Sequence, residues 1–359
     1  MLVHICCSVD SHFFLEKLQQ NYPDEKLIGF FYDPNIHPYS EYQLRLLDVK
    51  RSCKKLGIEL LEGDYDFENW MEAVRGLENE KEKGARCKVC FDRRFEVSVK
   101  KALELGEDKI TTTLLVSPLK SQEQLKRSGD SFFKKYGVEF IFYDYRKDGG
   151  TQDQSRVTKE QQLYRQGYCG CIYGLSMQRE EQNRLMDEMF SPISKQILPA
   201  SIEERIELYE HRIELEERDI QYKIVKEKFL NYRQFNFKLT SDKEAIPGYA
   251  LFYSTLPRKK AQGRIEFTDK EINYFNREEI RFVTLDFFNT TCNTNYDSVN
   301  EMIFNAPNIE TELKFRDSVL SSRYDLSPII IVDEIPQTKL TVELSVKTYE
   351  DSREKLIII

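Results

Sequence analysis

The sequence lacks the hydrophobic segments that membrane-spanning and secreted proteins carry. No run of about eighteen apolar residues occurs in the 359-residue chain, which excludes a transmembrane helix. The N-terminal residues, MLVHICC, contain neither a basic region nor a long apolar core, which argues against a secretory signal. We therefore expect a cytoplasmic protein in a reducing compartment, with no membrane partner. Structural disulfides are uncommon there, so cysteines point first to metal or redox chemistry.

Familiar nucleotide-binding signatures are also missing. The chain has no P-loop, no G-x-G-x-x-G and no Ser-Gly-Gly-type phosphate loop after its first predicted strand. This argues against nucleotide hydrolysis and nicotinamide binding in the sheet. With 53 Lys and Arg against 61 Asp and Glu, the net charge of −8 argues against a broadly basic nucleic-acid binder. A local basic patch remains compatible with this charge.

The first half of the chain alternates short apolar segments with helix-length segments. The expected strands cover residues 2–5, 26–32, 58–62, 109–113 and 139–144, and the expected helices cover 11–21, 40–56, 67–77, 91–105 and 121–136. This alternation predicts an α/β fold, a doubly wound and mostly parallel sheet with helices on both faces. Sites in such sheets form beyond the carboxyl ends of the strands. Loops carrying Cys6, Cys7, Asp33, Asn35, Thr112 and Thr113 should therefore converge on one edge.

A domain boundary is expected near residue 195, because Pro192 and Pro199 interrupt the pattern there. We predict a catalytic α/β domain at 1–195 and a C-terminal extension at 196–359. The extension should begin with a charged helix, since Ser201 and Glu204 have the spacing of a capping box. Its apolar stripe is formed by Ile206, Tyr209, Ile213, Ile220 and Ile224. Short strand-like runs follow, and no motif assigns the extension a role. We expect it to lie outside the catalytic machinery.

Six of the eight cysteines form three tight pairs. Cys6-Cys7 and Cys87-x-x-Cys90 together supply four thiolates, enough for a tetrahedral zinc or for a [4Fe–4S] cluster. The spacing alone favours neither. Thiolates at such spacings are costly to gather unless a metal, a cluster or a disulfide holds them. Asp10 follows the first pair closely and is a candidate metal-binding or outer-shell carboxylate.

The third pair, Cys169-Gly170-Cys171, is of a different kind. A disulfide across a single glycine closes a small, strained ring that is easily reduced, which suits a cycling redox pair. The alternative is that these thiolates are further metal ligands. Arg165 and Gln166 precede the pair and could aim donors at an anion or a polar ring. His37 lies in a rigid loop at the expected site edge.

Several long motifs resemble those of the cobalamin-independent epoxyqueuosine reductases, the QueH family. They fall in family order over about residues 1–180: His4-x-Cys6-Cys7, Phe31–Pro38 (FYDPNIHP), Glu41-Tyr42, Arg86-Cys87-x-x-Cys90-x-x-Arg93, Thr111–Pro118 (TTTLLVSP) and Tyr164–Cys171 (YRQGYCGC). The resemblance implies reduction of the epoxide of epoxyqueuosine in tRNA to queuosine, the last step of that pathway.

The resemblance also implies site residues. It places the ligands of a [4Fe–4S] cluster on Cys6, Cys7, Cys87 and Cys90, and a redox-active disulfide on Cys169 and Cys171. Many family members have Cys-Cys-x-Pro-Cys after the first strand, whereas this chain has Cys6-Cys7-Ser8-Val9-Asp10. Asp10 replaces the third cysteine, so any role of that thiolate in other family members cannot be assigned to this chain. An additional iron beside the cluster is a further candidate cofactor.

The remaining site residues follow as candidates. Removal of an epoxide oxygen takes two electrons and two protons, so catalytic groups are sought among Asp10, Asp33, His37 and Tyr168, and substrate contacts among Asn35, Thr112, Thr113, Arg165 and Gln166. Partners are the tRNA anticodon loop and an external electron donor. A basic patch for the tRNA is expected from Lys120, Lys126, Arg127, Lys134, Lys135, Arg146 and Lys147. Two other functions stay open: a tRNA- or protein-binding module with structural zinc, and a general disulfide oxidoreductase.

Overall fold

The computed structural model describes residues 1–117, 121–190, 194–277, 279–322 and 324–359. Pro118, Lys120 and Pro192, used above, lie outside these ranges. The chain divides into two compact units. The first comprises residues 1–189, 205–224 and 356–359, and the second comprises 190–204 and 225–355. Within the described ranges, no helix is both long and apolar enough to cross a membrane.

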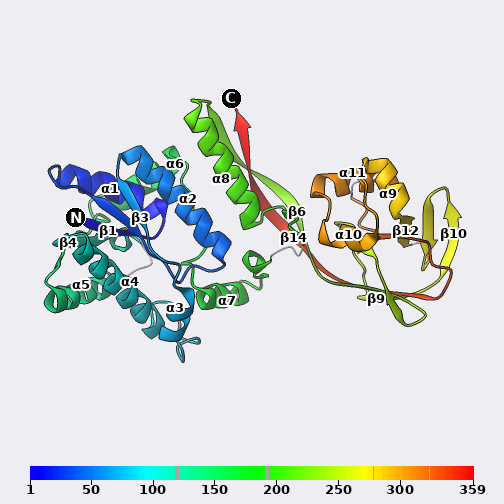
Figure 1. The fold of residues 1–359 in the computed structure, drawn as a ribbon, viewed down its shortest axis with the longest axis horizontal. Helices are drawn as coiled ribbons and strands as arrows, with labels where there is room; N and C mark the ends of the chain where they lie inside the picture. Colours follow the sequence, from blue (N-terminus) through cyan, green and yellow to red (C-terminus); the bar gives the residue numbers. More distant parts are fainter. Residues whose placement is uncertain (118–120, 191–193, 278, 323) are drawn as a thin grey trace. The chain divides into compact units, whose positions relative to one another are not determined.

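The first unit is built on a five-stranded sheet in the order β3-β2-β1-β4-β5 (Figure 1). Its pairings are all parallel, which confirms the predicted fold class. The strands are β1 (Leu2–Ile5), β2 (Ile28–Phe31), β3 (Glu59–Glu62), β4 (Lys109–Thr112) and β5 (Glu139–Phe140). The chain runs from β1 outward to β3 and then returns to add β4 on the other side of β1. This reversal creates a switch point at the carboxyl ends of β1 and β4, where ligand sites form in open α/β sheets.

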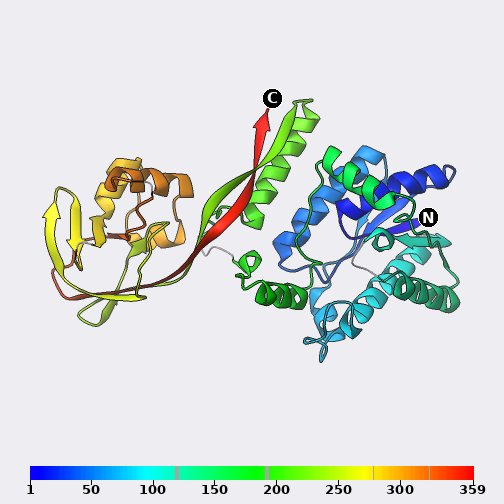
Figure 2. The same ribbon diagram turned by 180° about the vertical axis from the view of Figure 1, so that it is seen from behind.

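Helices cover both faces of this sheet (Figures 1 and 2). They are α1 (Ser8–Asn21), α2 (Tyr39–Leu56), α3 (Phe67–Ala73), α4 (Ala85–Glu104), α5 (Gln122–Tyr136), α6 (Gly150–Glu160) and α7 (Ile172–Glu181). Successive residues of β1 point to opposite faces, so Val3 packs with Phe14 and Val49 of α1 and α2. Leu2 packs instead with Val99 of α4. Burial on both faces explains why β1 and β2 are continuously apolar.

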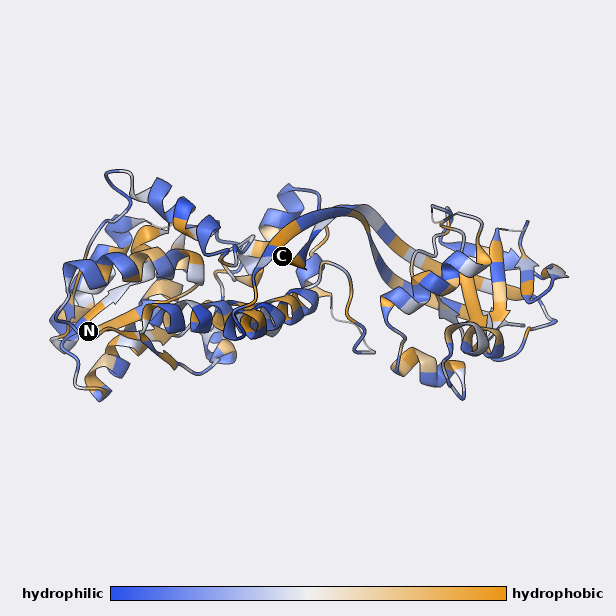
Figure 3. Ribbon diagram, turned by 90° about the horizontal axis from the view of Figure 1, so that it is seen from above, coloured by the Kyte–Doolittle hydropathy of each residue, from blue (hydrophilic) through white to orange (hydrophobic). Residues whose placement is uncertain are grey.

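The second unit has its own core around a sheet in the order β10-β11-β12-β13-β8. These strands are β8 (Tyr249–Ala250), β10 (Ile265–Asp269), β11 (Ile272–Phe275), β12 (Ile280–Thr284) and β13 (Ile329–Val332). Helices α9 (Leu285–Cys292), α10 (Val299–Phe304) and α11 (Ile309–Val319) pack on Ile329 and Ile331. Ile330 faces the opposite cluster with Leu340 and Val342. Figure 3 shows hydrophobic residues concentrated on the strands of this sheet.

The charged helix predicted at residue 201 is α8 (Ile202–Glu217). Its capping box is present: Ser201 Oγ accepts from the Glu204 N–H at 3.1 Å, and the Glu204 carboxylate accepts from the Ala200 N–H at 2.7 Å. The predicted stripe is too long, because the helix ends at Glu217 and Ile224 belongs to β6 (Tyr222–Ser241).

β6 lies beside β14 (Leu340–Ile358) in a four-stranded sheet with β7 (Glu244–Ile246) and β9 (Lys260–Gly263).

A buried acid should make the stability of the second unit depend on pH. Burial raises the pKa of Glu312 to about 7, although the Phe252 N–H and the Tyr249 hydroxyl donate to its carboxylate, each at 2.7 Å. The folded state therefore keeps a proton that the unfolded chain loses from pH 4.5 upward. The bound proton contributes about 3 kcal/mol to the free energy of unfolding. This contribution is complete below the unfolded-state pKa of 4.5 and is lost as the pH rises through the folded-state pKa of about 7.

We expect the Glu312→Gln variant to lose this part of the pH dependence. Differential scanning calorimetry of the full chain at pH 5 and pH 8 measures it, as the shift of the transition assigned to the second unit. A wild-type shift equal to that of the variant would contradict the prediction.

Candidate metal and redox site

A pocket open to solvent lies at the carboxyl edge of the first sheet and has a cavity volume of about 140 Å³. Five of the six paired cysteines line it: Cys6, Cys87, Cys90, Cys169 and Cys171. Cys7 is buried, with its Sγ 3.8 Å from that of Cys6. Three cysteine pairs far apart in the sequence thus meet at one place. Asp10, Asn35, Gln166 and Tyr168 are also part of the lining.

The first pair is positioned by the turn from β1 into α1. Cys6 follows the strand directly, and Cys7 is the extended residue before the first turn of α1. Cys6 Sγ lies 3.9 Å from Asp10 Oδ2, and one ligand atom each from Cys6, Cys7 and Asp10 lie within 4.8 Å of one another. The Cys6 hydrogen bond, burial and the nearby Asp10 carboxylate raise the pKa of the Cys7 thiol. A bound metal ion would reverse this by favouring the thiolate.

The second pair lies inside the first turns of α4. The helix begins at Ala85, before the predicted start at residue 91, so Cys87 and Cys90 are one turn apart on the same helix face. Cys87 Sγ accepts from the Lys83 N–H at 3.2 Å. The N-terminal end of a helix favours negative charge, which suits thiolate ligands. Arg86, buried in the same turn, is held by the carbonyl oxygens of Leu77 and Glu78.

The third pair is held in a turn that requires glycine. Gly170 has φ +104°, and a Cβ there would lie 2.8 Å from Ile36 Cγ1. Its carbonyl oxygen accepts from the His37 N–H at 2.9 Å. Cys171 is the residue before α7. The hydrogen bond with Cys169, followed by burial, raises the pKa of the Cys171 thiol.

A buried arginine that the sequence did not single out anchors this turn. Arg45 of α2 is 2% exposed and donates to the carbonyl oxygens of Tyr168 at 3.0 Å and Cys169 at 3.2 Å. Its Nε lies 2.8 Å from the Glu41 carboxylate, which also accepts from the Tyr164 hydroxyl at 2.8 Å. α2 therefore orients the segment that carries the third pair. The one sequence feature that could have indicated Arg45 is its i, i+4 spacing from Glu41. Exposed ion pairs on helices have the same spacing, so this feature does not identify a buried pair.

Other lining residues present polar atoms into the pocket. The Asn35 Oδ1, Gln166 Oε1 and Trp70 Nε1 atoms are buried and have no hydrogen-bond partner among the described residues. Buried polar atoms of this kind are normally satisfied, so a bound molecule is a natural partner for them. Trp70 is 1% exposed and packs with Cys90 and Cys171. The sequence analysis passed over Trp70.

Asp33, Thr112 and Thr113 lie behind the pocket wall. Asp33 is buried and forms an ion pair with Arg94, and burial raises the pKa of Asp33 to about 6 against the opposing effect of that guanidinium. Thr112 Oγ1 lies 2.8 Å from His4 Nδ1, and Thr113 Oγ1 lies 3.8 Å from Cys6 Sγ. Arg94 itself lines the pocket. Asp33 therefore contacts the pocket lining through Arg94, and Thr113 contacts it through Cys6.

His37 and Arg165 do not line the pocket either. His37 stacks on Phe67 with ring centroids 4.8 Å apart, and burial lowers the pKa of its imidazole. Its backbone nevertheless supports the third cysteine pair, through Gly170 and through a hydrogen bond from the Tyr168 hydroxyl to the His37 carbonyl oxygen. Arg165 is exposed. Of the candidate catalytic groups other than the cysteines, Asp10 and Tyr168 line the pocket.

We expect the Gly170→Ala variant to be destabilised by about 1–3 kcal/mol, because an L residue at this φ is strained and its Cβ meets Ile36. Gly174→Ala is the matched control. Gly174 lies within α7, and a Cβ there would only reach ordinary contact distance, 3.6 Å from Cys169 Sγ. Urea unfolding monitored by Trp70 fluorescence measures both variants. Equal stability of the two would contradict the strain argument.

Comparison with known proteins finds sequence relatives of one family. Residues 1–177 match the sequence profile of epoxyqueuosine reductase QueH. The Helicobacter pylori protein of that name is 41% identical over 360 residues, 96% of this chain and 96% of the relative. The Histophilus somni protein is 38% identical over 176 residues, 49% of this chain and 72% of the relative. The Thermotoga maritima protein is 34% identical over 184 residues, 50% of this chain and 93% of the relative.

Two solved structures show weaker similarity. A predicted tRNA methyltransferase subunit of Methanocaldococcus jannaschii has a TM-score of 0.35 at 12% identity, over 53% of this chain and 92% of that chain. The U34-tRNA thiolase NcsA of Methanococcus maripaludis, with its [4Fe-4S] cluster, has a TM-score of 0.32 at 14% identity, over 60% and 73%. These scores are too low to support an argument about function.

The fold and the sequence relatives place the chain among α/β oxidoreductases that act on tRNA. It belongs to the epoxyqueuosine reductase QueH family.

Proposed function

We propose that this protein reduces the epoxide of epoxyqueuosine in tRNA to the alkene of queuosine. The observation that carries the proposal is the meeting of three cysteine pairs around one pocket, with Cys7 directly behind Cys6. Family membership supports the choice of substrate. A cytoplasmic location follows from the proposal, since tRNA and reducing conditions are found there.

Cys6, Cys7, Cys87 and Cys90 are the proposed ligands of a [4Fe–4S] cluster. The donor set fits, because four thiolates are the usual ligands of such clusters. The protein environment fits as well: both pairs lie at helix N-termini, and Arg86 and Arg94 bring positive charge to the pocket lining. When bound, the cluster would supply single electrons at low potential. Asp10 would then either hold an additional iron with Cys6 and Cys7 or supply a proton.

The proposed chemistry balances with the groups at the site. Two electrons and two protons convert the epoxide to an alkene, and the oxygen leaves as water. Oxidation of the Cys169 and Cys171 thiols to one disulfide supplies two electrons and two protons. An external low-potential reductant must then reduce the disulfide again. Tyr168 and Asp10 line the pocket and can relay protons to the leaving oxygen.

The pocket suits an unstacked nucleoside. It is concave and open to solvent, and aromatic and aliphatic side chains line it together with a few polar groups. Asn35 and Gln166 offer amide groups, and Trp70 offers an indole N–H, to the polar edges of the base or the cyclopentane ring. The substrate base must leave the anticodon-loop stack to enter, as in other enzymes that modify bases. The exposed Arg165 and the surface residues Lys126, Arg127, Lys134 and Lys135 are proposed phosphate contacts.

Anaerobic purification and nucleoside mass spectrometry test the function. We expect a brown protein with iron and sulfide, which converts epoxyqueuosine in tRNA to queuosine when a reductant is supplied. About four irons per chain would match one cluster alone, and about five would support an additional iron. A colourless protein with one zinc would instead support the binding module. Reduction of generic disulfides without tRNA would support the third function.

A further inference from the structure

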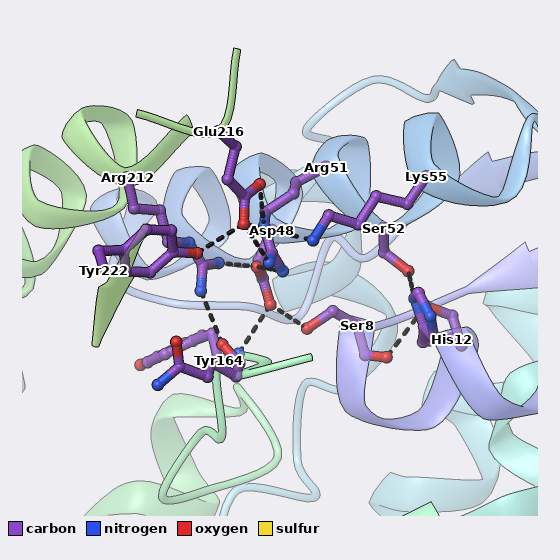
Figure 4. A network of polar contacts seen from close by, with 12 residues as sticks. Ser8, His12, Asp48, Arg51, Ser52, Lys55, Tyr164, Arg212, Glu216 and Tyr222 are labelled. Carbon is purple, nitrogen blue, oxygen red and sulfur yellow. Dashed lines mark hydrogen bonds and ion pairs between the residues drawn. The ribbon is translucent and has the colours of Figure 1, made fainter. Parts of the chain in front are cut away.

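A buried carboxylate connects the catalytic segments to the C-terminal extension. Asp48 of α2 is 0% exposed. Its Oδ2 accepts hydrogen bonds from the Ser8 hydroxyl and, at 2.7 Å, from the Tyr164 N–H. Arg212 of α8 donates to its Oδ1 (Figure 4). Ser8 directly follows Cys7, and Tyr164 begins the segment that ends in Cys169 and Cys171. One carboxylate therefore touches both redox elements.

Arg212 is as deeply buried as the group that it neutralises. It is 0% exposed, and its Nη1 donates to the Gln162 carbonyl oxygen at 2.6 Å. Its guanidinium lies 3.9 Å from the ring centroid of Tyr209, which packs edge-on against Tyr164 at 5.6 Å. Arg212 thus contacts the segment before the third cysteine pair directly, as well as through Asp48. Its contacts all lie within the first unit.

A second ion pair holds α8 in the same place. Arg51 of α2 binds both carboxylate oxygens of Glu216, at 2.8 and 2.6 Å, and the Tyr222 hydroxyl donates to Glu216 Oε1 at 2.5 Å. Arg51 Nη1 lies 3.7 Å from Asp48 Oδ1. Paired, planar contacts of this kind fix orientation more strongly than a single lysine contact. α8 is therefore docked onto α2 by two buried or half-buried arginine pairs.

We propose that Arg212 is a positioning residue of the reductase site, acting through Asp48 to fix the Cys7 turn and the Cys169-Gly170-Cys171 segment relative to each other. The inference rests on the proposed function for its catalytic consequence. It differs from our expectation that the extension lies outside the catalytic machinery, since Arg212 lies beyond residue 177, where the family profile ends. The physical reason is that a buried charge without its partner is strongly unfavourable, so Asp48 needs Arg212 to remain in place.

The test uses full-length variants and two separate readouts. In Arg212→Met, we expect faster amide hydrogen exchange in peptides covering residues 6–12 and 162–171. We also expect kcat to fall about tenfold, as for other residues that support site groups indirectly, with little change in KM for tRNA. The KM should hold because Arg212 does not line the pocket. Assays run well below the unfolding midpoint of each variant.

A matched control shows whether the effect is specific to Arg212 or follows from the loss of any ion pair between α2 and α8. Lys54 of α2 and Glu217 of α8 form an exposed ion pair at 2.8 Å, with side chains 73% and 57% exposed. Exposed pairs contribute little, so Lys54→Met should match the wild type in exchange and in kcat. If Arg212→Met fails to fold, the charge-balanced double variant Asp48→Asn/Arg212→Met replaces it. The amide can still accept from Ser8 or Tyr164, but the guanidinium contact with Gln162 is gone.

The outcomes separate this inference from the proposed function. Faster exchange in both peptides with a lower kcat supports the inference. Wild-type exchange in both peptides of a folded Arg212→Met variant, or in the 162–171 peptide of the double variant, overturns it. If the wild type shows no epoxide reduction, the proposed function fails, while the exchange data still decide whether Arg212 fixes the two segments. Arg212→Lys adds a graded comparison with Arg212→Met: partial recovery of kcat together with slower exchange in both peptides supports positioning, and recovery of kcat without any slowing of exchange argues against it.

Discussion

Replacing Cys87 or Cys90 by alanine is expected to remove the brown colour and most of the iron and sulfide from the protein. Both residues line the pocket with Cys6, one helical turn apart at the N-terminal end of α4. Removal of one thiolate leaves the cluster with three of its four bonds to the protein, and α4 offers no other thiol at that position. Alanine at Cys6 or Cys7 should act in the same way. Epoxyqueuosine reduction should fall more than about tenfold in each variant.

The isolated cysteines provide the control. Cys53 is buried in the core of the first unit, and Cys292 is half-buried in the second. Cys53→Ala and Cys292→Ala should keep the wild-type iron content, sulfide content and visible spectrum. Iron and sulfide per chain, measured on anaerobically purified protein, decide the matter. A single replacement within the four that leaves both values unchanged would remove that residue from the ligand set.

The strand pattern of the first unit could be predicted because it depends on local composition. Strands buried on both faces are mostly apolar, and the predicted segments 2–5 and 26–32 correspond to β1 and β2. The convergence of the cysteine pairs followed from this topology, since loops after parallel strands share an edge. The start of α4 at Ala85 was missed, because Gly84 provides no side-chain cap that the sequence would reveal.

The polar supports of the site could not be recognised in the sequence. Arg45, Asp48 and Arg212 occur in helices of mixed charge, where most such residues are solvated. Their burial arises from contacts between segments more than a hundred residues apart, such as Asp48 with Arg212 and Arg45 with Tyr168. Trp70 was missed for a similar reason: its indole faces the pocket only because α3 packs against α4.

Replacing both Cys169 and Cys171 by serine is expected to abolish conversion of epoxyqueuosine while leaving the cluster in place. Both residues line the pocket, yet the four proposed ligands are complete without them. Serine preserves the size of the side chain but cannot form a disulfide. The pair therefore cannot supply the two electrons that reduce the epoxide. The visible spectrum and the iron content should match the wild type, and mass spectrometry of tRNA nucleosides should show no queuosine.

A single-turnover experiment gives this prediction its sharpest form. Reduced wild-type protein, freed of external reductant, should convert at most one epoxyqueuosine per chain and then contain a Cys169–Cys171 disulfide, detectable by thiol labelling and peptide mass spectrometry. Adding a low-potential reductant should restore repeated turnover, because a dithiol used once must be reduced again. Repeated turnover by the double serine variant at the wild-type rate would refute the redox role. Loss of iron from that variant would instead assign the pair to the metal site, and the proposed ligand set would then have to include Cys169 or Cys171.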